Sequence, residues 1–116
     1  MSDKTFELAL LFDFFGDLLT EKQREYFDLY YNNDLSLSEI SEMNGISRQG
    51  VRDNLLRAEN TLRELEAKTG VVKKFREMQD SIKAIEADAV CLARNCSGSD
   101  RETAERILFM LQNLKG

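Results

Sequence analysis

The sequence predicts an all-α protein built around a helix-turn-helix unit. Apolar residues recur at steps of three and four along most of the chain, which is the spacing of one face of an α-helix. The chain contains no proline, so no ring interrupts a helix. Between Leu37 and Leu55 a short apolar segment, a glycine and a longer segment follow one another at the spacing of a helix-turn-helix. We therefore expect five to six helices, with a long recognition helix and a C-terminal helical extension.

Composition narrows the possible functions. The 116 residues are 42% hydrophobic and 32% charged, enough for one domain or two small helical ones. Histidine is absent, which removes Ser-His-Asp and Cys-His catalysis. Cys91 and Cys96 have no further thiol or imidazole nearby to complete a metal shell, and we expect Cys91 to be a small core residue. The sequence thus predicts a protein that is not an enzyme, with no catalytic residues, metal or cofactor.

The chain carries no signal for export or membrane insertion. Its longest apolar run, Leu8 to Phe12, is far shorter than the roughly twenty residues that span a bilayer. The start, Met1 to Asp3, lacks the basic residues of a signal peptide. We therefore expect a cytoplasmic protein with reduced thiols and no membrane insertion.

The first two helices are predicted over Met1 to Leu19 and from Thr20 to about Tyr31. The first is apolar around most of its circumference, so it is either wrapped by its own core or shared with a second copy. The second begins with Thr20 and Gln23 at the spacing of a capping box. Residues 32–34, Asn-Asn-Asp, are typical of a turn and should end this helix.

The next two helices form the motif itself. A capping box at Ser36 and Glu39 starts a short helix that ends at Asn44, where Gly45 supplies a left-handed turn. Ser47 is a good N-cap for the long helix that follows. That helix should end near residues 69–70, Thr-Gly, where its apolar stripe breaks.

Two more helices are predicted in the C-terminal half. Apolar residues from Val71 to Leu92 alternate steps of four and three, forming a narrow seam. The seam favours packing on another helix of the same chain, with an intermolecular coiled coil as the alternative. A last helix should begin at the Ser99 and Glu102 capping box and reach about Leu114. We expect an N-terminal domain over 1–69 and a C-terminal helical hairpin over 70–116, either separate or packed on the first as one domain.

The packing positions of the helix-turn-helix can be assigned individually. Ile40 and Val51 should be the apolar contacts between its two helices, and Ser41 the small residue at their closest approach. Gly45 forms the turn, and Ile46 should be the apolar plug beneath it. Alanine is more usual than serine at the position of Ser41.

The candidate site is the exposed start of the recognition helix. The net charge of −5 makes the whole chain a poor ligand for polyanions, so nucleic-acid binding requires a local basic patch. Arginine pairs with guanine and glutamine with adenine, while a serine at a helix N-terminus can hold a phosphate. The residues expected to bind nucleic acid are Ser47, Arg48, Gln49, Arg52, Asp53 and Arg57. The alternative is that these side chains are only a solvated helix face.

The same segments resemble known bacterial proteins. Residues 19–24, 35–40 and 45–55 are similar to region 4 of sigma factors, which reads promoter DNA and touches RNA polymerase, but no segment resembles the DNA-melting region 2. The whole layout, including residues 12–14 (Phe-Asp-Phe) and 53–54 (Asp-Asn), resembles the YlxM family of small helix-turn-helix proteins. This resemblance is strong over residues 5–66. It implies a part in, or regulation of, the signal recognition particle pathway.

Two functions follow as expectations. The first is a homodimeric, nucleic-acid-binding regulator whose partner is DNA, with the RNA of the signal recognition particle as the other candidate. The second is a protein–protein adaptor of the secretion or transcription machinery that uses the helical fold without nucleic acid. The two differ in salt dependence, because phosphate contacts weaken steeply with salt and apolar contacts do not.

Overall fold

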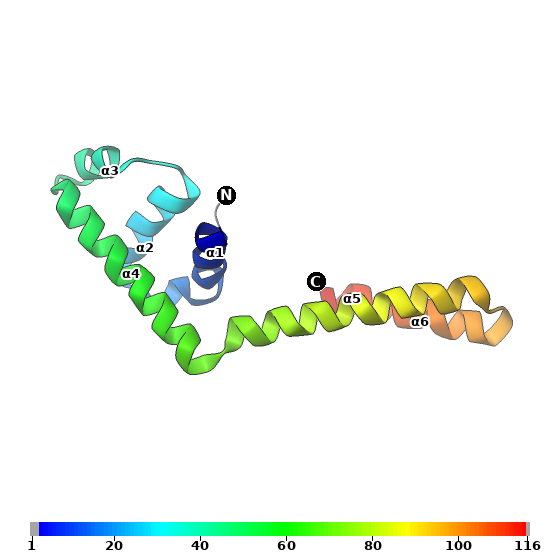
Figure 1. The fold of residues 1–116 in the computed structure, drawn as a ribbon. Helices are drawn as coiled ribbons and strands as arrows, with labels where there is room; N and C mark the ends of the chain where they lie inside the picture. Colours follow the sequence, from blue (N-terminus) through cyan, green and yellow to red (C-terminus); the bar gives the residue numbers. More distant parts are fainter. Residues whose placement is uncertain (1–2, 116) are drawn as a thin grey trace. The chain divides into compact units, whose positions relative to one another are not determined.

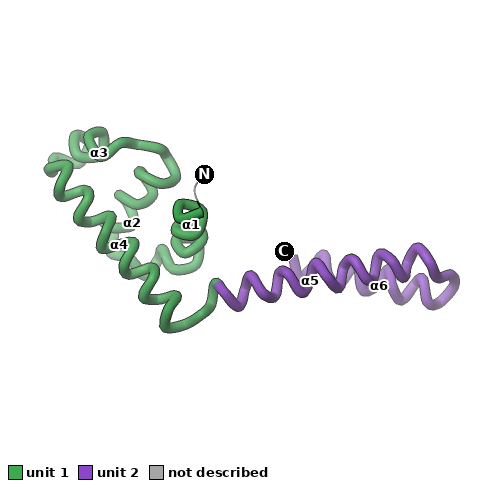
Figure 2. Tube along the Cα trace, in the orientation of Figure 1, with its two compact units in different colours: residues 1–72 green, residues 73–116 purple. Residues whose placement is uncertain are grey.

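The structure is a computed structural model that describes residues 3–115, and most of these are helical with no strand among them. The all-α prediction is confirmed. The chain divides into two compact units, residues 1–72 and 73–116 (Figure 2). Each unit is described by itself below.

The first unit begins with α1 (Asp3–Phe15) and a 3-10 turn, η1 (Gly16–Leu18). Leu8, Leu11 and Phe15 are buried on one side of α1. Phe6 of α1 is 53% exposed and Leu18 of η1 is 65% exposed, so this first segment is buried on one side only. The first two residues of the predicted helix lie outside the described residues.

The second helix changes type along its length. It runs as α2 (Glu21–Phe27) and continues as a π-helical turn, η2 (Asp28–Asn32). The predicted capping box is present: the Gln23 amide donates to Thr20 Oγ1 at 3.1 Å, and the Thr20 amide donates to Gln23 Oε1 at 3.2 Å. The Asn33 amide donates to the Asp28 carbonyl at 3.2 Å, which is the five-residue spacing of a π turn.

The helix-turn-helix consists of α3 (Leu37–Asn44) and α4 (Arg48–Thr69), seen together in Figure 1. Ser36 and Glu39 form the second predicted capping box, with both hydrogen bonds at 3.1 Å. Gly45 ends α3 with a φ of 66°, which a residue with a side chain adopts only at a cost. Both helix starts and both helix ends therefore follow from local sequence.

The core of the first unit lies among α1, α2, α3 and α4. Its largest fully buried side chains are Leu8, Phe27, Ile40, Val51 and Leu62, each at most 1% exposed. The Phe27 ring stacks on Phe12 with centroids 4.6 Å apart. This core fixes the position of α4 relative to α3.

The second unit is a helical hairpin. It contains α5 (Val71–Asn95), whose first two residues belong to the first unit, and α6 (Gly98–Lys115). Lys115 Nζ lies 2.6 Å from Glu86 Oε2, so α6 runs back along α5 and ends opposite its middle (Figure 1). Helix α6 begins one residue before the predicted cap Ser99, which lies inside its first turn.

One prediction for this half is wrong, and another holds only in part. Cys91 is exposed, not a core residue, because it lies on a side of α5 that α6 does not cover. The seam is mostly uncovered by its own chain: Ala89 is buried, but Met78, Ile85 and Leu92 are 48–55% exposed. Within residues 3–115, no helix is long and apolar enough to cross a membrane.

Candidate nucleic-acid interface

The packing of α3 on α4 presents the start of α4 at the surface. Ile40 and Val51 are both 0% exposed, as expected for the contacts between the two helices of the motif. Ser41 is half-buried, and its hydroxyl donates to the Ser38 carbonyl at 3.0 Å. A serine is accommodated at this position because its hydroxyl is satisfied within its own helix.

The predicted plug at Ile46 is wrong in part. Ile46 is 36% exposed, so it is not sealed beneath the turn. Its side chain lies over Gly50, where an added Cβ would be 3.6 Å from Ile46 Cδ1. The absence of a side chain at Gly50 leaves room for Ile46 on the surface of α4.

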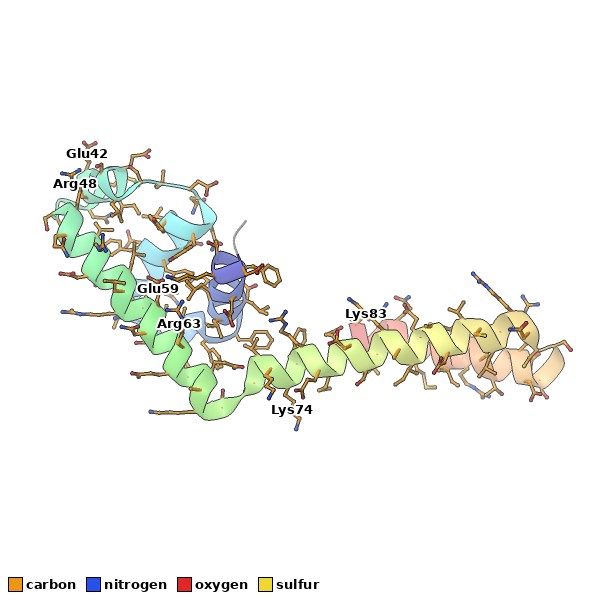
Figure 3. All side chains as sticks on the ribbon, in the orientation of Figure 1. Glu42, Arg48, Glu59, Arg63, Lys74 and Lys83 are labelled. Carbon is orange, nitrogen blue, oxygen red and sulfur yellow. The ribbon has the colours of Figure 1, made fainter. Side chains whose placement is uncertain are left out.

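All six candidate residues are exposed in the structure. They are Ser47, Arg48, Gln49, Arg52, Asp53 and Arg57. Arg48 lies at the start of α4, beside α3 (Figure 3). The side chains that a groove-reading helix would need are thus accessible on this unit.

Ser47 caps the N-terminus of α4. Its Oγ accepts a hydrogen bond from the Gly50 amide at 3.0 Å, and its carbonyl accepts from the Val51 amide at 3.1 Å. The amides of Arg48 and Gln49 precede the first intrahelical hydrogen bond and point out of the helix end. These amides and the positive end of the helix dipole favour an anion at this point.

Gln49 and Asp53 interact one helical turn apart. Gln49 Nε2 donates to Asp53 Oδ1 at 2.9 Å. The contact holds the amide side chain in place and leaves its oxygen and one N–H group for another partner. Residues four apart are neighbours on the surface of a helix, so the spacing of Gln49 and Asp53 already indicated this contact, although we did not predict it.

Four of the six candidate residues line one open hollow on the surface. It has a volume of about 450 Å³ and is lined by Leu37, Ser47, Arg48, Gln49 and Arg52. Asp53 joins this group through its hydrogen bond to Gln49, whereas Arg57 does not line the hollow. Leu37, at the start of α3, is an apolar member that sequence reasoning missed. The hollow offers two cations, an amide and an apolar wall to one ligand.

A second hollow, of about 250 Å³, lies farther along α4 and shares Arg52. Its lining includes Glu59, which is the one buried charged residue among residues 3–115 and is 6% exposed. The Tyr31 hydroxyl donates to Glu59 Oε1 at 3.1 Å. Burial raises the pKa of Tyr31 well above its ordinary value of 10.0, and the Glu59 carboxylate raises that pKa further. Sequence reasoning missed Glu59 because a charged residue in a polar stretch of helix looks solvated.

The described residues hold no cluster of three or more side chains suited to a metal ion. The site consists instead of the capped start of α4 with its exposed arginines, next to α3, which packs against it. The fold and site together define a helix-turn-helix protein.

Comparison with known proteins places the chain more closely. Residues 2–97 match the family UPF0122, described as "Putative helix-turn-helix protein, YlxM / p13 like". A UPF0122 protein of Caldanaerobacter subterraneus subsp. tengcongensis is 55% identical over 85 residues, covering 73% of each chain. One from Halalkalibacterium halodurans is 40% identical over 114 residues, 98% of this chain and 96% of that protein. One from Bacillus cereus strain AH187 is 51% identical over 79 residues, 68% and 72% of the two chains. The chain belongs to the UPF0122, YlxM-like family, as its resemblance predicted.

Proposed function

We propose that this protein is a non-enzymatic, nucleic-acid-binding regulator that reads DNA with the first turns of α4. The observation that carries the proposal is the exposed group of Ser47, Arg48, Gln49 and Arg52 around one hollow on the helix-turn-helix. In proteins with this motif the recognition helix enters the major groove N-terminus first, and these are the side chains at that end. The family's description as helix-turn-helix supports the same proposal.

The residues divide by chemistry. Arg48 and Arg52 are suited to guanine edges or phosphates, and the Gln49 amide, held by Asp53, to adenine. Ser47 and the free amides of the first turn are suited to a phosphate. Arg57 lies outside the hollow and is expected to contact the nucleic-acid backbone. A protein of net charge −5 gains little from its overall field, so this patch has to supply most of the attraction.

The biological setting we propose is the signal recognition particle pathway, which the resemblance to YlxM implies. The RNA of the particle is therefore the second nucleic acid to be compared with DNA. Two copies of α4 on two half-sites would suit a homodimer.

Fluorescence anisotropy with labelled genomic DNA fragments and with the particle's RNA tests the proposal at two salt concentrations. Each phosphate contact should weaken binding about 3.5-fold over a fourfold rise in salt. The Arg48→Ala, Arg52→Ala double variant should lose affinity and show a shallower salt dependence. The matched control is Arg76→Ala, Arg94→Ala, which removes the same charge from two exposed arginines of α5. Equal loss in both variants would show a general charge effect and refute the site.

A second function is favoured by one observation. Phe6 and Leu18 leave large apolar side chains exposed on the first unit, at 53% and 65%. These residues suit a protein partner of the secretion or transcription machinery. Failure of the folded wild-type protein to bind either nucleic acid would support this adaptor function instead.

A further inference from the structure

The second unit buries very little of its own apolar surface. Across the described part of residues 73–116, its buried side chains are Ala89, Ala104 and Leu111, and two of these are alanines. A domain of this size rarely holds a stable fold unless its core is large for its length or a partner adds to it. The hairpin therefore needs further apolar contacts.

Three exposed apolar side chains of α5 form one stripe. Met78, Ile85 and Leu92 recur at intervals of seven residues and are 55%, 48% and 52% exposed. Seven residues are close to two helical turns, so the three lie on one face. The stripe lies next to Ala89 around the axis of α5. Because Ala89 is buried, the stripe borders the surface of α5 that contacts α6.

Helix α6 adds apolar side chains to the same side of the hairpin. Leu114 is 66% exposed and Met110 51% exposed, one helical turn apart. Going from the buried Ala89 back to Ile85 turns about the axis of α5 in the same sense as going from the buried Leu111 back to Met110 turns about the axis of α6, each seen from its own N-terminus. Because α5 and α6 run in opposite directions, these two turns lead to the same side of the hairpin. The Lys115 to Glu86 ion pair closes the opposite side of the hairpin. The uncovered face is thus built by both helices.

A line of polar residues runs beside the stripe and carries charge of opposite sign at its two ends. Lys74, Ser81 and Asp88 recur at intervals of seven residues, each four residues before a member of the stripe. Among the described residues, neither Lys74 nor Asp88 makes an ion pair within its own chain. Lys74 points away from α5 on the side opposite to Lys83 (Figure 3).

This charge pattern fits a second copy of the same chain in one orientation. A two-fold axis at Ser81 places Lys74 opposite Asp88 of the partner subunit, and places Asp88 opposite the partner's Lys74. A parallel alignment would place like charges together. In a symmetric interface each such contact occurs twice.

The same axis brings the apolar residues together. In this pairing Met78 would lie beside Ile85 of the partner subunit, and the small Ser81 would lie at the axis, where the two helices approach closely. Helix α6 ends opposite Glu86, so the part of α5 before Ile82 has no α6 beside it in its own chain. In this pairing a partner subunit would fill that space, and Leu114 would come within reach of the partner's Met78.

We propose that this face, formed by Met78, Ile85, Leu92, Met110 and Leu114, is a self-association surface that joins two copies antiparallel through α5. The expected form is a symmetric dimer with two pairs between Lys74 and the partner's Asp88. The proposal does not depend on nucleic-acid binding, and its test contains no nucleic acid. Failure of one proposal is therefore distinguishable from failure of the other.

Sedimentation equilibrium of the full chain tests the surface. The wild-type protein should have twice the mass of the 13.4 kDa chain. Lys74→Glu and Asp88→Lys should each weaken the dimer about tenfold, because two attractive pairs become repulsive. The double variant Lys74→Glu, Asp88→Lys should recover dimerisation, since its charges are exchanged but complementary. Lys83→Glu, which makes the same charge change on the opposite side of α5, should leave the mass unchanged.

Mixing experiments separate this register from general charge effects. The charge-exchanged chain should pair with itself and not with the wild-type chain, measured by co-purification of two differently tagged pure proteins. Ile85→Asp should give a monomer with unchanged helical circular dichroism, because it places a charge within the apolar stripe. A monomeric wild-type chain at about 100 μM, or a double variant as weak as the single variants, would overturn the proposal.

Discussion

Removal of the Tyr31 hydroxyl should destabilise the first unit through the carboxylate that it leaves behind. Glu59 is 6% exposed and accepts a hydrogen bond from Tyr31 at 3.1 Å. In Tyr31→Phe the Glu59 carboxylate loses this donor and stays largely out of water. A buried group that loses its partner costs about 1–3 kcal/mol of unfolding free energy, and charged groups are at the upper end.

The size of the effect should depend on what remains at residue 59. The double variant Tyr31→Phe, Glu59→Leu removes both partners, which can be nearly neutral for a buried pair. It should therefore be more stable than Tyr31→Phe alone. Glu59→Gln keeps an acceptor for the Tyr31 hydroxyl, and should cost about 1 kcal/mol or less.

Urea unfolding followed by tyrosine fluorescence is a suitable assay. All three tyrosines of the chain, Tyr26, Tyr30 and Tyr31, lie in the first unit, so this signal reports its unfolding. The matched control is Tyr30→Phe, since Tyr30 is 37% exposed and should change the free energy by no more than about 0.5 kcal/mol. The reasoning is refuted if Tyr31→Phe costs no more than Tyr30→Phe, or if adding Glu59→Leu makes it less stable.

Two further outcomes follow from the described geometry. Because the pKa of Tyr31 is raised, the native chain keeps a proton that the unfolded chain loses near pH 10.0. The free energy of unfolding should therefore fall as pH rises above that value. This fall should be smaller in Tyr31→Phe, as measured by urea midpoints from pH 8 to pH 11. Gly45→Ala should lower the free energy of unfolding by about 1–2 kcal/mol, because the φ of 66° disfavours a Cβ although nothing lies within 4 Å of it. Gly45→Asn should cost less, and equal midpoints for wild type and Gly45→Ala in thermal unfolding would contradict a left-handed turn there.

Local signals in the sequence were sufficient for the starts of α2, α3 and α4 and for the ends of α3 and α4. The capping residues Thr20, Ser36 and Ser47 each make the hydrogen bond that their spacing predicts. Gly45 and Gly70 both end helices in the left-handed conformation. These features depend on residues within one or two turns of one another, so the sequence alone contains the information.

Features that depend on which helices meet in space were not predictable in this way. The seam of α5 has the regular spacing of a helix packed along its whole length, yet α6 ends opposite Glu86 and leaves much of it exposed. Glu59 is buried, and it accepts a hydrogen bond from Tyr31 of η2, 28 residues earlier in the chain. For the candidate site, exposure of its six residues could be expected from the helical pattern. The hollow that gathers four of them required the position of Leu37 on α3.

The π-helical turn at Asp28–Asn32 also has a consequence for how insertions and deletions act on this chain. A π turn is equivalent to one extra residue in an α-helix. Deleting one residue before Tyr31 in this turn would let the helix continue as regular α-helix, and the residues after it would keep nearly their present direction. Tyr31 would then still face Glu59. A single deletion in this turn should therefore be less damaging than one in the regular helix α2, where everything after it would rotate by about 100°.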